Sequence, residues 1–104
     1  MALHFSERDR RQLELLKERL FLYERDEIRL RTLIADLDFL IEAFEGADAA
    51  WRESLRKEWS VLEEVNAVAL DRGFAELDPE SERLVDRAVH GLFELVAAAQ
   101  EEAR

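Results

Sequence analysis

Residues 45–65 read EGADAAWRESLRKEWSVLEEV, and this stretch contains a helix boundary followed by one long apolar helix face. Gly46 is predicted to end one helix as the residue after its C-terminal cap, and Asp48 to cap the next. Trp51 and Trp59 then recur with other apolar residues at steps of three and four, the spacing of one face of a helix. The members of this face are Trp51, Leu55, Trp59, Leu62, Asn66 and Ala69.

The stretch therefore predicts a helix over residues 48–72 that turns both tryptophans toward the core. Trp51, in the first turn, is expected to be the more exposed of the two, and both indole N–H groups should find acceptors. Asn66 is the one polar member of the face, and a buried amide there would bond to a neighbouring helix.

The N-terminal part carries two apolar segments separated by a charged interruption. Ser6 and Asp9 have the spacing of a capping box and predict a helix over residues 6–25. The apolar pattern stops at ERDE and resumes over residues 29–45. One helix spanning both segments would be about 57 Å long, whereas each later helix could cover only about 37 Å of it. We therefore expect a turn at residues 25–28, with one long kinked helix as the alternative.

The C-terminal part predicts a last helix over residues 79–103. Gly73 is placed to end the preceding helix, with Phe74 folding back on it. Asp78 followed by Pro79 is typical of a helix start. Gly91 lies on the apolar face and indicates close approach of another helix. The expected buried residues are Leu84, Val85, Ala88, Leu92, Leu95, Val96 and Ala99. The sequence thus predicts an all-α fold, an antiparallel four-helix bundle that forms a single domain over residues 1–104.

Composition and charge limit the location and the partners. The chain has no cysteine, which excludes disulfides and thiolate metal sites and fits a reducing cytoplasm. Its longest apolar run, residues 95–99, is far shorter than the roughly 20 residues of a transmembrane helix, and no signal peptide is recognisable. The net charge is −10, and residues 32–104 carry eighteen acids against seven bases. We therefore expect a cytoplasmic protein that binds neither nucleic acid nor membrane, and whose partner is a basic protein.

Candidate catalytic and metal-binding residues are few. Asp86, His90 and Glu94 are spaced one helical turn apart, but neither histidine has a glutamate three residues before it, as the dinuclear carboxylate bundles require. Arg83 and His90 resemble the loose arginine to histidine spacing of the helical HEPN ribonucleases, although Leu84 replaces the polar residue that usually follows the arginine. We expect no catalytic residues, no cofactor and no metal, and a HEPN-like ribonuclease is the least favoured alternative.

Residues 33–73, LIADLDFLIEAFEGADAAWRESLRKEWSVLEEVNAVALDRG, resemble the small all-helical immunity proteins of bacterial polymorphic or contact-dependent toxin systems. The resemblance covers about two fifths of the chain and rests on Asp36, Leu37, Leu40, Trp51, Trp59, Leu62, Glu63 and Ala67. It implies a non-catalytic cytoplasmic protein that binds one cognate toxin domain and covers or distorts its active site.

The acidic residues indicate where such a partner would bind. Toxins that cut nucleic acid need basic clefts, and a carboxylate-rich helix can occupy such a cleft in place of phosphate. The acids of the second helix recur at steps of four and three residues, and two acids of the third helix extend this stripe. The predicted partner-binding residues are Asp38, Glu42, Glu45, Asp48, Glu63 and Glu64.

A helical adaptor or oligomerisation module is the main alternative to an immunity protein. In that case an apolar strip formed by Ala35, Phe39 and Ala43 would make the contact, and self-association would be one of its forms.

Overall fold

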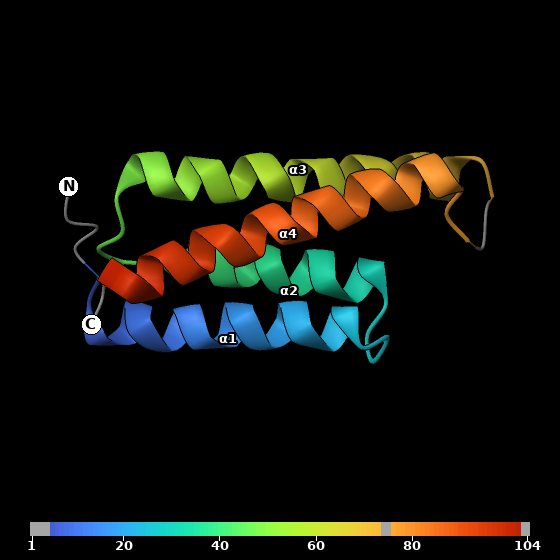
Figure 1. Ribbon diagram of the computed structural model, residues 1–104. Helices are drawn as coiled ribbons and strands as arrows, with labels where there is room; N and C mark the ends of the chain where they lie inside the picture. The colour runs from blue at the N-terminus through green and yellow to red at the C-terminus, as the bar shows by residue number, and fades with distance from the viewer. Residues whose placement is uncertain (1–4, 74–75, 103–104) are drawn as a thin grey trace.

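The computed structural model describes residues 5–73 and 76–102, and within them the chain forms four α-helices and no strand (Figure 1). The helices are α1 (Glu7–Glu24), α2 (Leu30–Glu42), α3 (Ala49–Asp71) and α4 (Pro79–Glu102). They run alternately in opposite directions, each packs on its neighbours in the sequence, and α4 also packs on α1. The predicted all-α antiparallel four-helix bundle is confirmed. The largest error in its boundaries is at the end of α2, which was predicted to reach residue 45.

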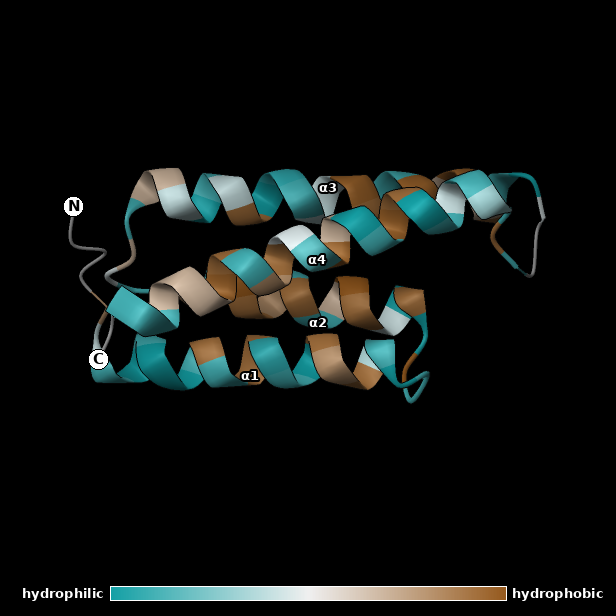
Figure 2. Cartoon of the chain, viewed as in Figure 1, coloured by the Kyte–Doolittle hydropathy of each residue, from teal (hydrophilic) through white to brown (hydrophobic). Residues whose placement is uncertain are grey.

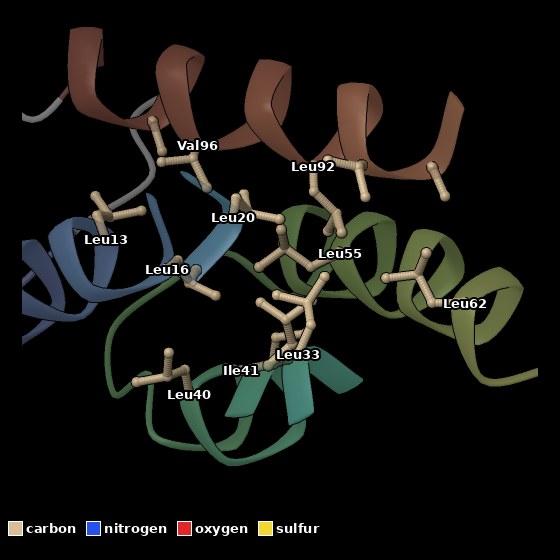
Figure 3. Close-up of a cluster of buried hydrophobic side chains, with 14 of the residues drawn as sticks. Leu13, Leu16, Leu20, Leu33, Leu40, Ile41, Leu55, Leu62, Leu92 and Val96 are labelled. Carbon is tan, nitrogen blue, oxygen red and sulfur yellow. The ribbon is translucent and has the colours of Figure 1, made fainter. Parts of the chain in front are cut away.

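Leucine side chains from all four helices form one shared core (Figure 3). Apolar and polar residues alternate along each helix (Figure 2), and the buried side chains are almost all apolar. Complete burial of one such side chain contributes about 1.5–3 kcal/mol to stability. The prediction for α4 was wrong at Leu84, which is 41% exposed, whereas Val85 beside it is buried as predicted. Leu95, also predicted to be buried, is only partly so.

A tight turn separates α1 from α2, so the predicted break is confirmed and the alternative of one kinked helix is wrong. Asp26 has a φ of 59°. Its N–H donates to the carbonyl of Tyr23 at 3.0 Å, and the N–H of Glu27 donates to the carbonyl of Leu22 at 2.9 Å. These are the two hydrogen bonds of a Schellman motif. Aspartate is one of the few residues besides glycine that visit the left-handed region, and it ends α1 here without a glycine or a proline.

At the opposite end of the bundle, the side chain of Asp9 joins α1 to the connection between α2 and α3. It forms the predicted capping box with Ser6. Asp9 is 0% exposed, and its carboxylate also accepts hydrogen bonds from the backbone N–H groups of Glu45 at 2.8 Å and Gly46 at 2.9 Å. These hydrogen bonds compensate for the loss of water around the buried charge. The prediction that Gly46 ends a helix is wrong. α2 ends at Glu42 instead, and the N–H of Gly46 is held by Asp9.

These hydrogen bonds set the ionisation of Asp9. Burial raises the pKa of its carboxyl, but the N–H groups of Glu45, Gly46 and Ser6 stabilise the charged form and leave the pKa below its usual value. The folded protein therefore contains a buried carboxylate at neutral pH.

Three aromatic rings close the core beside Asp9. Phe5, Phe44 and Trp51 pack edge to face, with ring centroids 5.1–6.3 Å apart. The indole N–H of Trp51 donates to the carbonyl of Leu95 on α4 at 3.1 Å. This part of the molecule, formed by Phe5, Asp9, Phe44 and Trp51, is referred to below as the capped end.

The other predicted caps are confirmed. The Asp48 side chain accepts the N–H of Ala50 at the start of α3, and α3 is followed by Gly73 with a φ of 72°. Asp78 accepts the N–H of Ser81 at 2.7 Å, and α4 begins at Pro79. Phe74, predicted to fold back on α3, lies outside the described residues.

Gly91 faces α3, as expected for a point of close approach. A Cβ atom at this position would lie 1.8 Å from Oε2 of Glu58. The neighbouring atoms belong to a flexible side chain and not to the backbone of α3, so the approach is one of side chain to helix.

The two long helices extend beyond the two short ones. α3 has 23 residues and α2 has 13, a difference of about 15 Å in length. Because α2 and α3 both have an end at the capped end, the excess of α3 and α4 projects past the turn at Asp26 (Figure 1). This part is referred to below as the notched end. No helix among the described residues is both long and apolar enough to cross a membrane.

Candidate functional site

The acids predicted on α2 lie at the surface, but they are paired with arginines. Arg56 on α3 reaches across to α2 and donates from Nη1 to Oδ1 of Asp38 at 2.7 Å and from Nη2 to the carboxylate of Glu42. Arg8 on α1 donates to Glu45 at 2.9 Å. Asp38, Glu42 and Glu45 each keep more than half of their side chain exposed. The predicted stripe is therefore a set of exposed, ion-paired carboxylates.

Arg56 is held in place by the indole of Trp59. The guanidinium carbon lies 4.9 Å from the ring centroid, within the range of a cation–π contact. The ring is itself fixed, because its N–H donates to the carbonyl of Ile34 on α2 at 2.9 Å. Partial burial alone would lower the pKa of Arg56. Its hydrogen bonds to Asp38 and Glu42 together outweigh this effect, so the pKa lies above its usual value. The seam between α2 and α3 thus carries an ordered network from Ile34 to Glu42.

The two tryptophans have different roles. Trp51 is 7% exposed and belongs to the core, whereas Trp59 is only partly buried. The prediction that Trp51 would be the more exposed one is wrong, because Phe5 and Phe44 cover its ring. The expectation that both indole N–H groups find acceptors is confirmed.

The remaining predicted acids are placed differently. Asp48 is occupied as the cap of α3. Glu63 and Glu64 are exposed, and neither forms an ion pair with a described residue. Glu63 follows Arg56 by seven residues, so it lies on the same face about 10 Å further along α3. Glu64 is turned about 100° away from it. Geometry therefore groups Glu63, but not Glu64, with the acids of α2.

An aromatic side chain stands on the outward face of α2 next to this network. Phe39 is 75% exposed, the largest value among the exposed large hydrophobic residues. Asp38 directly precedes it, and Glu42 follows it by three residues. Ala35, one turn before Phe39, is also exposed. The acidic stripe and the apolar strip are alternative predictions for the contact surface. In the structure, residues of both lie on one surface. This surface, formed by Ala35, Asp38, Phe39 and Glu42, is referred to below as the α2 face.

The residues considered for metal binding or catalysis lie on the exposed face of α4. Nε2 of His90 lies 2.6 Å from Oε1 of Glu94, and both side chains are exposed. The described residues include no group of three or more His, Cys, Asp or Glu side chains that could hold a metal ion. Arg83 is exposed two turns before His90.

Sequence reasoning missed the partners of the predicted acids. Arg56 was placed off the core face of α3, and nothing in the local pattern connects it with Asp38, which lies 18 residues earlier. The pairing depends on the register of α3 against α2, which the spacing within one helix does not specify.

Comparison of the chain with protein-family models, with curated proteins and with solved structures found no match.

Proposed function

We propose that this chain is a non-catalytic protein-binding domain that uses the α2 face to bind a basic partner, in the manner of a cytoplasmic bacterial immunity protein that neutralises a toxin. The observation that carries the proposal is Phe39, an aromatic side chain 75% exposed and flanked by carboxylates. A large aromatic residue surrounded by polar groups is the usual anchor of a protein interface.

The acids beside Phe39 are suited to binding because their positions are already fixed. Arg56 holds Asp38 and Glu42 in defined orientations, and Trp59 holds Arg56. Immobilising one flexible side chain at an interface costs about 0.5–1.5 kcal/mol of entropy. A side chain that is already ordered in the free protein avoids this cost. A carboxylate offers about four lone-pair sites, so each acid can accept a partner cation while it stays bonded to Arg56.

Charge favours a basic partner over nucleic acid. The chain has a net charge of −10, which attracts cationic surfaces and repels phosphates. Toxins that cut nucleic acid have basic clefts, and in this proposal the α2 face occupies such a cleft, with Phe39 in an apolar pocket and the carboxylates against lysine or arginine.

The proposal is tested with the product of the gene next to this one in the source genome, by measuring association and dissociation rates at two salt concentrations. Phe39→Ala should weaken binding by about 2 kcal/mol or more, roughly 30-fold, mainly through faster dissociation. Asp38→Asn combined with Glu42→Gln should slow association and reduce its salt dependence, because steering by charge is screened over about 10 Å at 0.1 M salt.

Two variants serve as matched controls. Phe21 is also an exposed aromatic residue, but it lies on α1, so Phe21→Ala should leave the rates unchanged. Glu18→Gln removes an exposed charge from α1 and should likewise leave the association rate unchanged. If Phe39→Ala binds as tightly as the parent protein, the α2 face is not the contact.

Exposure of Phe39 also favours the adaptor or oligomerisation module, since the same surface can bind a second copy of the chain. Sedimentation equilibrium separates the two. A dimer that Phe39→Ala converts to a monomer would support self-association through the α2 face and would contradict the immunity-type proposal.

A further inference from the structure

The notched end contains an open groove lined by both apolar and charged side chains. It has a volume of about 1,020 Å³ and lies between the turn at Asp26 and the projecting parts of α3 and α4. Ile28 and Leu30 line it from the start of α2, and Leu70 and Leu77 line it from the far side. Leu70 is 60% exposed. The groove is therefore a place where leucine-sized side chains remain without full cover.

One wall of the groove continues into a smaller, strongly acidic hollow of about 280 Å³ around Tyr23. Its carboxylates come from two elements, Glu24 and Asp26 from the end of α1 and Glu82 and Asp86 from α4. None of these four acids forms an ion pair with a described residue. They differ in this from the acids of the α2 face, both of which are paired with Arg56.

The negative charges around this hollow affect the pKa of the Tyr23 phenol. Burial raises its pKa, and the charges of Asp86, Asp26, Glu82 and Glu24 raise it further. The four carboxylates therefore all lie close enough to the Tyr23 phenol to raise its pKa, and they form one cluster.

The groove also contains basic residues. Arg29 and Arg31 line the groove at the start of α2, and neither forms an ion pair with a described residue. Arg25 is neutralised by Glu27 at 2.8 Å. Acids nevertheless outnumber bases around the groove, because Glu27 and Glu76 line it as well.

We propose that this groove docks a segment of a partner protein that presents a leucine-sized apolar side chain to the exposed leucines of the groove and a lysine or arginine, one helical turn away, to the acids around Tyr23. Half-buried Asn66 lines the same groove and offers the segment a hydrogen bond. The contact goes beyond the proposed function, because it lies at the notched end and uses no residue of the α2 face.

A second copy of this chain is a poorer occupant. Each copy carries a net charge of −10, and acids outnumber bases around its groove, so two copies repel each other. Like charges placed face to face cost several kcal/mol. Charge therefore favours a basic segment from a different protein.

The proposal is tested with a synthetic amphipathic helical peptide of about 15 residues that carries leucines on one face and lysines beside them. It is titrated into the ¹⁵N-labelled full chain, and the amide signals of Tyr23, Asn66, Leu70 and Leu77 should shift together. Leu70→Ser should weaken the affinity about tenfold, because the peptide loses its apolar contact. Glu82→Gln combined with Asp86→Asn should weaken it about threefold to tenfold and lower its salt dependence.

Matched controls separate this contact from general attraction to an acidic protein. Glu18→Gln combined with Glu53→Gln removes the same charge at exposed positions elsewhere and should leave the affinity unchanged. A peptide that keeps the lysines but has serine in place of leucine should bind at least tenfold more weakly.

Four results would overturn the proposal: no binding, equal binding of the serine peptide, signal shifts confined to the α2 face, or shifts at the notch that appear on raising the protein concentration without peptide. Signal shifts confined to the α2 face would leave the proposed function unaffected. Conversely, if Phe39→Ala binds the toxin as tightly as the parent protein does, the proposal for the groove is unaffected.

Discussion

The two ends of the bundle solve the same packing problem in opposite ways. At the capped end, aromatic rings and a buried carboxylate close the core, and that carboxylate holds the N–H groups of Glu45 and Gly46 in the connection between α2 and α3. At the notched end, α3 and α4 project past the turn at Asp26, and Leu70 and four unpaired acids face outward. The capped end is therefore closed by contacts within the chain, whereas the notched end leaves apolar and acidic side chains exposed.

The largest contrast is expected for large-to-small substitutions. Trp51→Ala at the capped end should lower the free energy of unfolding by about 3–5 kcal/mol, because it leaves a cavity between Phe5 and Phe44 and an unpaired carbonyl at Leu95. Leu70→Ala at the notched end should change it by about 0.5 kcal/mol at most. Urea titration followed by circular dichroism measures both. Similar losses in the two variants would remove the difference between the ends.

A smaller but specific effect is expected at Asp9. Asp9→Asn should cost about 2–3 kcal/mol, because the amide nitrogen would face a backbone N–H and the charge that holds Glu45 and Gly46 would be lost.

The pH dependence of stability identifies the same group. The pKa of Asp9 is lower in the folded than in the unfolded chain, so its contribution is fully present above the unfolded-state value of about 3.9. It is lost as the pH falls through the lower, folded-state pKa. Stability measured from pH 6 downward should therefore decline less steeply in Asp9→Asn than in the parent protein. Parallel curves would mean that Asp9 does not carry this charge effect.

Trp59 lies between the two ends and should give an intermediate result. Trp59→Ala should cost about 2 kcal/mol, clearly less than Trp51→Ala, because its ring is only partly buried. It should also release Arg56, so the NMR signals of that guanidinium should lose their dispersion. Equal costs for the two tryptophans would mean that Trp59 contributes to the core as much as Trp51 does.

The smallest effect has the opposite sign. Asp26→Gly should stabilise the chain by about 0.5 kcal/mol, because glycine adopts a φ of 59° without the steric cost borne by aspartate, a gain partly offset by the greater freedom of glycine in the unfolded chain. Asp26→Ala removes the same carboxylate but keeps the Cβ atom, and it should be destabilising by about 1 kcal/mol. If both variants lose stability equally, the aspartate side chain and not the backbone conformation is what matters at this turn.

The sequence predicts what is local in this fold. Ser6 and Asp9 are three residues apart, Asp78 precedes Pro79 directly, and each apolar face repeats within one helix, so all of these features can be read without the structure. The second role of Asp9 could not be predicted, because Glu45 and Gly46 lie 36 and 37 residues away. For the same reason the sequence placed the end of α2 too late.

The candidate site shows the same limit. The acids of α2 and the exposed Phe39 follow from helical spacing, and their position at the surface was predicted. The arginines that pair with them could not be, because the pairing of Arg56 with Asp38 depends on how α2 and α3 align. The groove at the notched end was also not predicted, since it results from unequal helix lengths and from acids contributed by two elements that are distant in the sequence.

The order of the helices has a consequence for connectivity. α1 begins and α4 ends at the capped end, and these two helices pack side by side (Figure 1). The four helices thus form a closed ring of contacts in which three pairs are joined by the chain and the fourth is not. A circular permutant that links α4 to α1 and opens the chain at the Asp26 turn would keep every one of these contacts. Which two helices are terminal is therefore a property of the connections, and the packing of the core would be the same for either arrangement.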